Sequence, residues 1–316
     1  MEIILHIGAH RTATTTFQAY LRDNRAALAG LGVAAWEPHV TRKGLLSGVM
    51  PVAGAAAADE QMRRARARIG RGIETLAAQG MRQLLVSDEN MIGTPRHNRR
   101  RGALYPDIGG RMQRFSEAFG HGVGWVVLSI RPQDEFWSSV LIYSVMRGHR
   151  VPGAAELAAL ARAGHGWREP ITVLARALPG VEIRVLPHHP YAGRPDLRLA
   201  RMIAQPLHEA PMLPPVTDVE PLNASAELPR LRRLASARGR KPARLPGGEG
   251  RWSPFDLAQL CRLREIYSRD IAWLRAGADG LATLIEEEGP CRAGTNPAAG
   301  SLTRGHADDI EERRLA

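Results

Sequence analysis

The sequence is poor in cysteine and in aromatic residues, and each shortage excludes a class of protein. Its 316 residues include only two cysteines, Cys261 and Cys291, which lie far apart and are joined to no histidines in a ligand pattern. We therefore expect neither a disulfide framework nor a structural zinc site. Aromatic residues make up 5% of the chain, so aliphatic side chains and alanine must form most of the core.

Long apolar runs are also lacking. No run approaches the ~18 residues that a membrane-spanning helix needs. Residues 1–8 lead straight into an apolar segment, without the basic region and small-residue cleavage site of a secretory signal peptide. We therefore expect no transmembrane segment and a cytoplasmic location.

Acidic residues are too few to balance the basic ones. The chain has 43 Lys and Arg against 32 Asp and Glu, which gives a net charge of +11. Nucleic acid, an anionic membrane surface, an acidic polysaccharide and a polyanionic cofactor are all partners compatible with this charge. Much of the excess lies in alanine-rich stretches around Arg63–Arg68, which is typical of a solvated helix face. No dense basic block is interleaved with aromatics, so no nucleic-acid partner is expected.

Short apolar runs alternate with helical patterns along the first 190 residues. This alternation predicts an α/β fold in which a central parallel sheet carries helices on both faces. The expected strands are Ile3–Ile7, Gln83–Ser87, Gly124–Ile130 and Val181–Leu186. The expected helices cover about 17–31, 60–79, 135–146 and 168–178, the third capped by Asp134.

The remaining segments show weaker patterns. Residues 93–110 are rich in Arg, Gly and Pro and predict a long loop, and residues 239–252 predict a mobile basic loop. Apolar residues from Phe255 to Leu274 recur at helical spacing, which predicts a long amphipathic helix. We expect one domain over residues 1–288, with its core at about 1–190 and a helical, loop-rich part at 191–288. Residues 289–316 lose the hydrophobic pattern and predict a disordered tail.

The loop after the first strand is the most informative segment. A loop between a buried strand and a helix N-terminus presents backbone N–H groups and the positive end of the helix dipole to an anion. Gly8 and Ala13 are small enough for a close backbone approach, Arg11 adds a fixed charge, and Thr14–Thr16 add hydroxyls. The alternative is an ordinary connection whose threonines only cap the helix. The nucleotide-kinase pattern GxxxxGK[ST] is not met, because Ala13, Thr14 and Thr15 stand where Gly, Lys and Ser/Thr are needed.

The segment HIGAHRTATTTFQ, residues 6–18, resembles the 5'-phosphosulfate loop of sulfotransferases that use 3'-phosphoadenylyl sulfate (PAPS). The resemblance is to bacterial and carbohydrate-type members, which start with an HIGxHKTGTT-like segment; here Arg11 replaces the usual lysine and Ala13 the usual glycine. It implies a three-layer fold like that of P-loop NTPases, PAPS as donor, 3',5'-ADP as product and no metal. The cofactor-binding residues that it implies in this loop are Arg11, Thr12, Ala13, Thr14, Thr15 and Thr16.

A second motif follows the third predicted strand. In this family the strand that carries the 3'-phosphate site ends in an arginine, and a serine follows eight positions later on the next helix. The segment VVLSIRPQDEFWSS, residues 126–139, has this layout, with Arg131 at the carboxyl end of the strand, where ligands bind in open α/β sheets. The resemblance implies that Arg131 and Ser139 bind the 3'-phosphate. The alternatives are a surface salt bridge for Arg131 and a helix-surface hydroxyl for Ser139.

The resemblance also suggests catalytic residues. The segment LLVSDEN, residues 84–90, is similar to an SSEN-like segment of the same group, which makes Glu89 the candidate base. Asp88 and His10 compete for that role, and Glu89 is otherwise a loop carboxylate paired with Arg96 or Arg99. Arg11 is expected to stabilise charge on the bridging oxygen as 3',5'-ADP departs.

Weaker signals lie downstream. The pairs Asn223 with Ser225 and Tyr267 with Asp270 are similar to later positions of the family. Arg240 and Lys241, in the predicted basic loop, are candidates for phosphate contact if that loop is a flap over the nucleotide; a disordered linker is the alternative. His188 and His189 are flanked by prolines and predict a turn rather than a metal site.

Together these patterns predict a sulfotransferase that moves a sulfuryl group from PAPS to a hydroxyl or amine of a small-molecule or glycan acceptor. One alternative is a P-loop kinase-like or nucleotide-hydrolysing enzyme, which needs Mg²⁺ and a Walker-type lysine. Another is a non-catalytic protein that binds polyanions through its basic charge alone. No pattern in the sequence identifies the acceptor or the oligomeric state.

Overall fold

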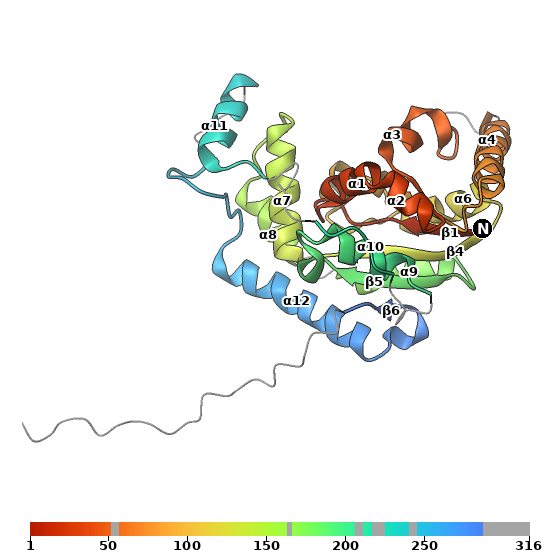
Figure 1. Ribbon diagram of the computed structural model, residues 1–316. Coiled ribbons are helices and arrows are strands. Elements are labelled where there is room, and N and C mark those ends of the chain that lie inside the picture. Colours follow the sequence, from red (N-terminus) through yellow and green to blue (C-terminus); the bar gives the residue numbers. More distant parts are fainter. Residues whose placement is uncertain (52–56, 163–165, 206–210, 217–224, 240–244, 287–316) are drawn as a thin grey trace, which may run out of the picture. The chain divides into compact units, whose positions relative to one another are not determined.

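Six parallel strands form a single sheet in the order β2-β3-β1-β4-β5-β6 (Figure 1). The computed structural model describes residues 1–51, 57–162, 166–205, 211–216, 225–239 and 245–286, all within a unit that spans Met1–Glu286. The strands are β1 (Glu2–His6), β2 (Val33–Trp36), β3 (Gln83–Ser87), β4 (Val123–Ile130), β5 (Glu182–Pro187) and β6 (Thr283–Leu284). The predicted α/β fold with a central parallel sheet is therefore confirmed.

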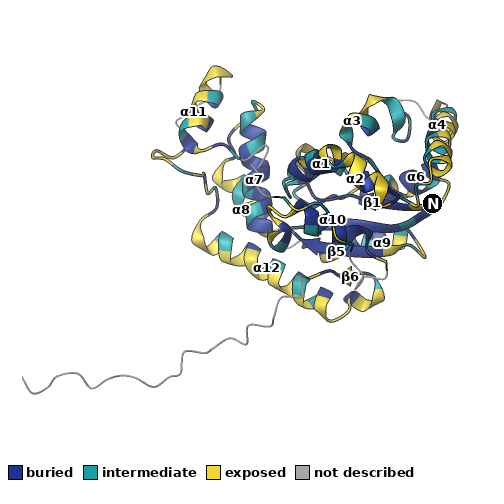
Figure 2. Cartoon of the chain, in the orientation of Figure 1, coloured by how far each residue is buried: buried dark blue, intermediate teal, exposed yellow. Residues whose placement is uncertain are grey.

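Alternating strand residues pack into two separate cores, one on each face of the sheet. Ile3 and Leu5 of β1 belong to one core, whereas Ile4 belongs to the other, as the period of two in a strand requires. The first core includes side chains of α4 (Ala58–Ala78), α6 (Ile108–Ala118), α7 (Gln133–Met146), α8 (Ala154–Arg162), α9 (Arg168–Ala177), α12 (Leu257–Arg275) and α11 (Leu228–Ala237), the last of which packs on α7. The second face is covered by α1 (Thr14–Asp23), α2 (Arg25–Gly30) and α10 (Pro195–Ile203). The strands are mostly buried, and the outer faces of helices such as α4 and α12 are exposed (Figure 2).

Shorter elements complete the described chain. They are α3 (Pro38–Val40), α5 (Pro95–Arg101) and the single turns η1 (Thr41–Leu45), η3 (Glu89–Ile92), η4 (His189–Tyr191) and η6 (Ala278–Gly280). The predicted amphipathic helix is α12, whose N-terminus is closed by a capping box between Asp256 and Gln259. None of the described helices is both long and apolar enough to cross a membrane.

Two local predictions were wrong. The segment 93–110 is not one long loop, because it contains α5 and the start of α6. The side chain of Thr94 caps α5 and Pro95 opens it, so this short helix depends on local capping rather than on apolar periodicity. Asp134 is not the cap of α7, since the N-cap is Pro132 and the Asp134 carboxylate instead accepts a hydrogen bond from Arg264 Nε at 2.8 Å.

The strand order places the carboxyl end of β1 between those of β3 and β4. From β1 the chain first forms β2 and β3 on one side, and then β4, β5 and β6 on the other. Such a reversal opens a crevice at the carboxyl edge of an open α/β sheet. The predicted tail 289–316 and the residues Asn223, Arg240 and Lys241 lie outside the described residues, and the domain limits remain predictions.

Candidate functional site

The loop after β1 has the geometry of an anion cradle. The N–H groups of Ile7 and Ala9 donate to the carbonyls of Val127 and Ser129, both at 2.9 Å, so the chain follows β4 beyond the end of β1. Arg11 and Ala13 then adopt left-handed backbone angles, with φ of 71° and 57°. Such turns direct successive N–H groups towards one point, and non-glycine residues in this region mark a site of stored strain.

The loop opens into a cleft of about 1120 Å³ at the carboxyl edge of the sheet. Thr12 is fully buried, and its hydroxyl donates to the Ala9 carbonyl at 2.7 Å, so this side chain closes the loop instead of facing the cleft. α1 begins at Thr14, which places its first N–H groups at the same point. The other cofactor-binding candidates and the first candidate for the base line the cleft: Arg11, Ala13, Thr14, Thr15, Thr16, Glu89, Arg131 and Ser139.

The two predicted phosphate motifs meet at the mouth of the loop. Arg11 Nε donates to Ser139 Oγ at 2.8 Å, and Arg131 Nη1 donates to the Arg11 carbonyl at 2.5 Å. Arg131 is 7% exposed; its Nη2 is also 2.5 Å from Glu135, while its buried Nε has no hydrogen-bond partner in the described part of the chain. Arg131 therefore forms an ion pair, as the alternative interpretation expected, and it also lies close to Arg11 and Ser139, as the two motifs predicted.

Two further residues join this cluster. Ser225 Oγ lies 3.1 Å from Ser139 Oγ and accepts from Arg11 Nη2, also at 3.1 Å. Arg251 Nη2 donates to the same Ser225 oxygen at 3.0 Å. Burial, with the charges of Arg131 and Arg251, lowers the pKa of the Arg11 guanidinium. A cluster of like charges of this kind favours an anionic ligand.

The three candidates for the base have different surroundings. Asp88 is buried and accepts from Thr41 Oγ1 at 2.7 Å, from Arg42 Nη2 at 2.6 Å and from the Asn90 N–H at 3.0 Å. Glu89 lines the cleft with a side chain that is 17% exposed.

Glu89 is bound neither to Arg96 nor to Arg99. Its two oxygens accept from Arg42 Nη2 at 2.9 Å and from Gln18 Nε2 at 3.1 Å. Arg99 instead pairs with Glu156 at 2.6 Å. Glu89 is therefore the carboxylate that combines access to the cleft with a fixed orientation.

His10 lines the cleft but uses both ring nitrogens. Its Nδ1 lies 3.0 Å from Tyr105 Oη, which accepts from the His10 N–H at 2.8 Å, and its Nε2 lies 3.1 Å from Asn90 Oδ1. Burial lowers the pKa of His10, against the opposing charge of Glu89. The ring is therefore neutral at pH 7, with the Nε2 proton directed at the Asn90 oxygen.

Of the residues with weaker sequence signals, some line the cleft and others do not. Ser225 lines the cleft, whereas Asp270 accepts from Gln133 Nε2 at 2.7 Å and from the Trp167 N–H at 2.6 Å, and so fixes the starts of α7 and α9. His188 and His189 form the predicted turn after β5. Within the described ranges, no group of three His, Cys, Asp or Glu residues is arranged to hold a metal ion.

Sequence reasoning missed Arg42 and Arg251, which line the cleft, and Gln18, which donates to the cleft residue Glu89. Gln18 lies within the first motif, and Arg251 lies within the predicted basic loop 239–252, so a signal for both was present. Arg42 has no such signal, because its role depends on the contact of η1 with Asp88, the residue that follows β3.

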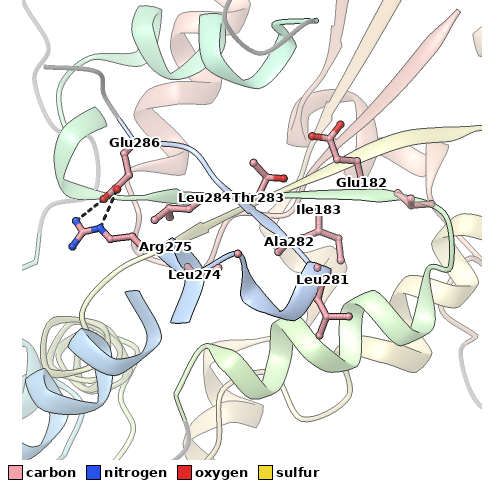
Figure 3. A pocket seen from close by; sticks show the side chains of 12 residues that line it. Glu182, Ile183, Leu274, Arg275, Leu281, Ala282, Thr283, Leu284 and Glu286 are labelled. Atoms are coloured by element: carbon pink, nitrogen blue, oxygen red, sulfur yellow. Dashed lines mark hydrogen bonds and ion pairs between the residues drawn. The ribbon is translucent and has the colours of Figure 1, made fainter. Parts of the chain in front are cut away.

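A second cavity, of about 530 Å³, lies beside the amino end of β5. Arg275 and Glu286 lie together at one side of it, joined by two hydrogen bonds of 3.0 and 2.7 Å (Figure 3). Glu182, at its rim, is bound by Arg184. The charges of this cavity are therefore paired, whereas the described lining of the cleft has far more arginines than carboxylates.

Comparisons with known proteins give a distant likeness. No family model and no curated protein matches the sequence. Among solved structures, a sulfotransferase from Alicyclobacillus acidocaldarius is similar over 75% of this chain and 92% of that chain, with 11% identity and a TM-score of 0.40. A likeness this weak does not decide function, which has to be argued from the residues of the site.

Proposed function

We propose that this protein transfers a sulfuryl group from PAPS to the hydroxyl or amine of an acceptor. One observation carries the proposal: Arg11, and Arg131 with Ser139, from two motifs about 120 residues apart in sequence, meet at the mouth of the loop after β1. PAPS carries anionic groups at both its 5' and 3' positions, and a site for it needs two anion subsites in one cleft.

The loop and the Arg131 cluster would serve these two subsites. The N–H groups of residues 13–15 and the hydroxyls of Thr14 and Thr15 would hold the 5'-phosphosulfate. Arg131 and Ser139 would hold the 3'-phosphate through charge-assisted hydrogen bonds. Ser225, which contacts Arg11 and Ser139, and Arg251, which contacts Ser225, would extend the second subsite.

The transfer itself would be an in-line displacement at sulfur. The acceptor oxygen or nitrogen forms a bond to sulfur while the bond from sulfur to the bridging oxygen breaks, and 3',5'-ADP leaves with that electron pair. Glu89 would take the acceptor proton. Arg11 would turn its guanidinium from Ser139 and Ser225 towards the bridging oxygen, where its charge offsets the developing negative charge.

The kinase-like alternative is less well supported. A nucleotide kinase of this type needs a lysine at the end of the loop that reaches the phosphates, and this chain has Thr14 at that position. The polyanion-binding alternative uses only net charge and gives no reason for the convergence of Arg131 and Ser139.

Calorimetric titration with 3',5'-ADP tests the proposal, with 5'-AMP and ATP-Mg²⁺ as controls. We expect wild type to prefer 3',5'-ADP, and Arg131→Ala to weaken that ligand roughly tenfold to hundredfold, because hydrogen bonds to a charged group contribute about 1.5–3 kcal/mol. Affinity for 5'-AMP should change little. Arg147→Ala is the matched control, since Arg147 also lines the cleft but contacts Tyr143.

Two results would count against a PAPS site. The first is equal affinity of wild type for 3',5'-ADP and 5'-AMP. The second is tight, Mg²⁺-dependent binding of ATP, which would support the kinase-like alternative.

A further inference from the structure

Beneath the loop lies an arginine that the proposed chemistry does not yet use. Arg198, on α10, is 4% exposed. Its Nη1 donates to the Thr12 carbonyl at 2.8 Å, and its Nη2 donates to Ser129 Oγ at 2.7 Å and to His6 Nε2 at 3.0 Å. Its guanidinium lies over the Phe17 ring, 5.0 Å from the ring centre. Three of these four partners carry no charge, and the fourth, His6, is kept neutral by its contact with Arg198.

The His6 ring cannot act as a counter-charge. Its Nε2 accepts from Arg198, so its proton is on Nδ1 and is donated to Ser87 Oγ at 2.8 Å. Burial and the neighbouring Arg198 charge lower the pKa of His6 well below its usual value. Among the described residues, no carboxylate forms an ion pair with Arg198, and burial lowers the pKa of its guanidinium to about 9.

A buried charge without a counter-charge is costly. A second buried arginine of the same fold, Arg184, does have a counter-charge. Arg184, on β5, is 2% exposed and contacts the carbonyls of Met202 and Ala204 at the C-terminal end of α10. It has an ion pair with Glu182 at 2.8 Å. Arg198, at the other end of α10, lacks such a partner and faces the loop.

The contact with Thr12 also orients the loop. In a trans peptide the N–H points opposite to the C=O, so a Thr12 carbonyl held by Arg198 directs the Ala13 N–H away from the interior. Ala13 lines the cleft. A cation on the carbonyl side polarises this peptide and strengthens its N–H as a donor.

We infer that Arg198 is a positioning residue for the donor, and that the anion bound on the loop is its missing counter-charge. This inference rests on the loop being the 5'-anion subsite of the proposed function. Arg198 acts through the Thr12–Ala13 peptide and through its charge, without touching the ligand.

Binding of four ligands to variants tests the inference. The pair 3',5'-ADP and adenosine 3'-phosphate differs only in the 5'-phosphate, and so does the pair 5'-AMP and adenosine. We expect Arg198→Gln, which retains a donor but no charge, to reduce the preference for the 5'-phosphate in both pairs roughly tenfold or more. Arg198→Lys, which retains the charge, should keep most of the preference. Arg184→Gln is the control: it perturbs α10 and should lower the unfolding temperature with the preference intact.

The outcomes separate the possible failures. If Arg198→Gln retains the wild-type preference, or if the Lys and Gln variants lose it equally, the inferred role of the charge is wrong. Should Arg198→Gln fail to fold, Arg198→Met provides the same neutral comparison with an unbranched side chain. If wild type shows no preference for the 3'-phosphate but Arg198 still controls the 5'-phosphate, the PAPS proposal fails and this inference survives.

Discussion

At the scale of single residues, Asp88 and Glu89 are neighbours whose surroundings assign them different roles. We expect Glu89→Gln to lower kcat about 10²–10⁴-fold, the usual contribution of a general base, with affinity for 3',5'-ADP unchanged. Sulfate transfer to an acceptor found by screening, followed with labelled PAPS, measures this. Turnover that survives in Glu89→Gln would rule out its role as the base.

Asp88→Asn is the comparison for Glu89→Gln. Asp88 is buried among Thr41, Arg42 and the Asn90 N–H, so its neutralisation should lower the free energy of unfolding by about 1–3 kcal/mol. If Asp88→Asn lost turnover while its stability was unchanged, the two roles would have to be exchanged.

The candidate site residues that the structure brings together in the cleft are those with a local signal in the sequence. Arg131 follows an apolar strand, Ser139 follows it at a fixed spacing, and Arg11 lies between a strand and a helix. Arg198 carries no such signal, because an arginine on an amphipathic helix is normally solvated. Only the packing of α10 against the carboxyl ends of β1 and β4 buries it.

At the scale of elements, the same distinction explains which strands were found. β1, β3, β4 and β5 have apolar runs buried on both faces and were predicted within one or two residues. β2 and β6 are the edge strands, only four and two residues long, and a short edge strand needs no continuous apolar run. α5 was missed because its arginines give no apolar stripe.

The end of β1 gives a prediction about pH. Because His6 has a lowered pKa in the folded protein, the unfolded chain binds more protons once the pH falls below about 6.5. The stability due to neutral His6 is therefore complete above this pH and is lost as the pH falls, by up to about 1.4 kcal/mol per pH unit. Urea unfolding at pH 7.5 and 5.5 measures the loss.

The variant His6→Gln isolates this contribution from those of His10 and His188, whose pKa values are also lowered, mainly by burial. Its stability deficit relative to wild type should shrink as the pH falls. A deficit that stays constant between the two pH values would mean that His6 does not titrate differently in the folded and unfolded states.

At the scale of the whole molecule, only part of the net charge of +11 lies where it can act on a ligand in the cleft. The lining of the cleft includes, among the described residues, eight arginines and two glutamates. Arg66 and Arg71, on the exposed side of α4, add to the net charge but do not line the cleft. A cleft in which one sign of charge predominates concentrates the field on its ligand, whereas charges more than about 10 Å away are screened at 0.1 M salt.

We therefore expect salt to weaken binding of 3',5'-ADP, and to leave binding of uncharged adenosine nearly unchanged. Titrations from 50 to 500 mM NaCl should show a fall of roughly tenfold for 3',5'-ADP, as expected when a ligand of several charges loses attraction by a basic cleft. Arg131→Ala should flatten this salt dependence, because it removes a charge from the binding site. The double variant Arg66→Ala/Arg71→Ala removes more charge from the protein and should retain the wild-type dependence. If the α4 variant flattened it as much as Arg131→Ala, the overall charge would account for binding, and the polyanion-binding alternative would be preferred.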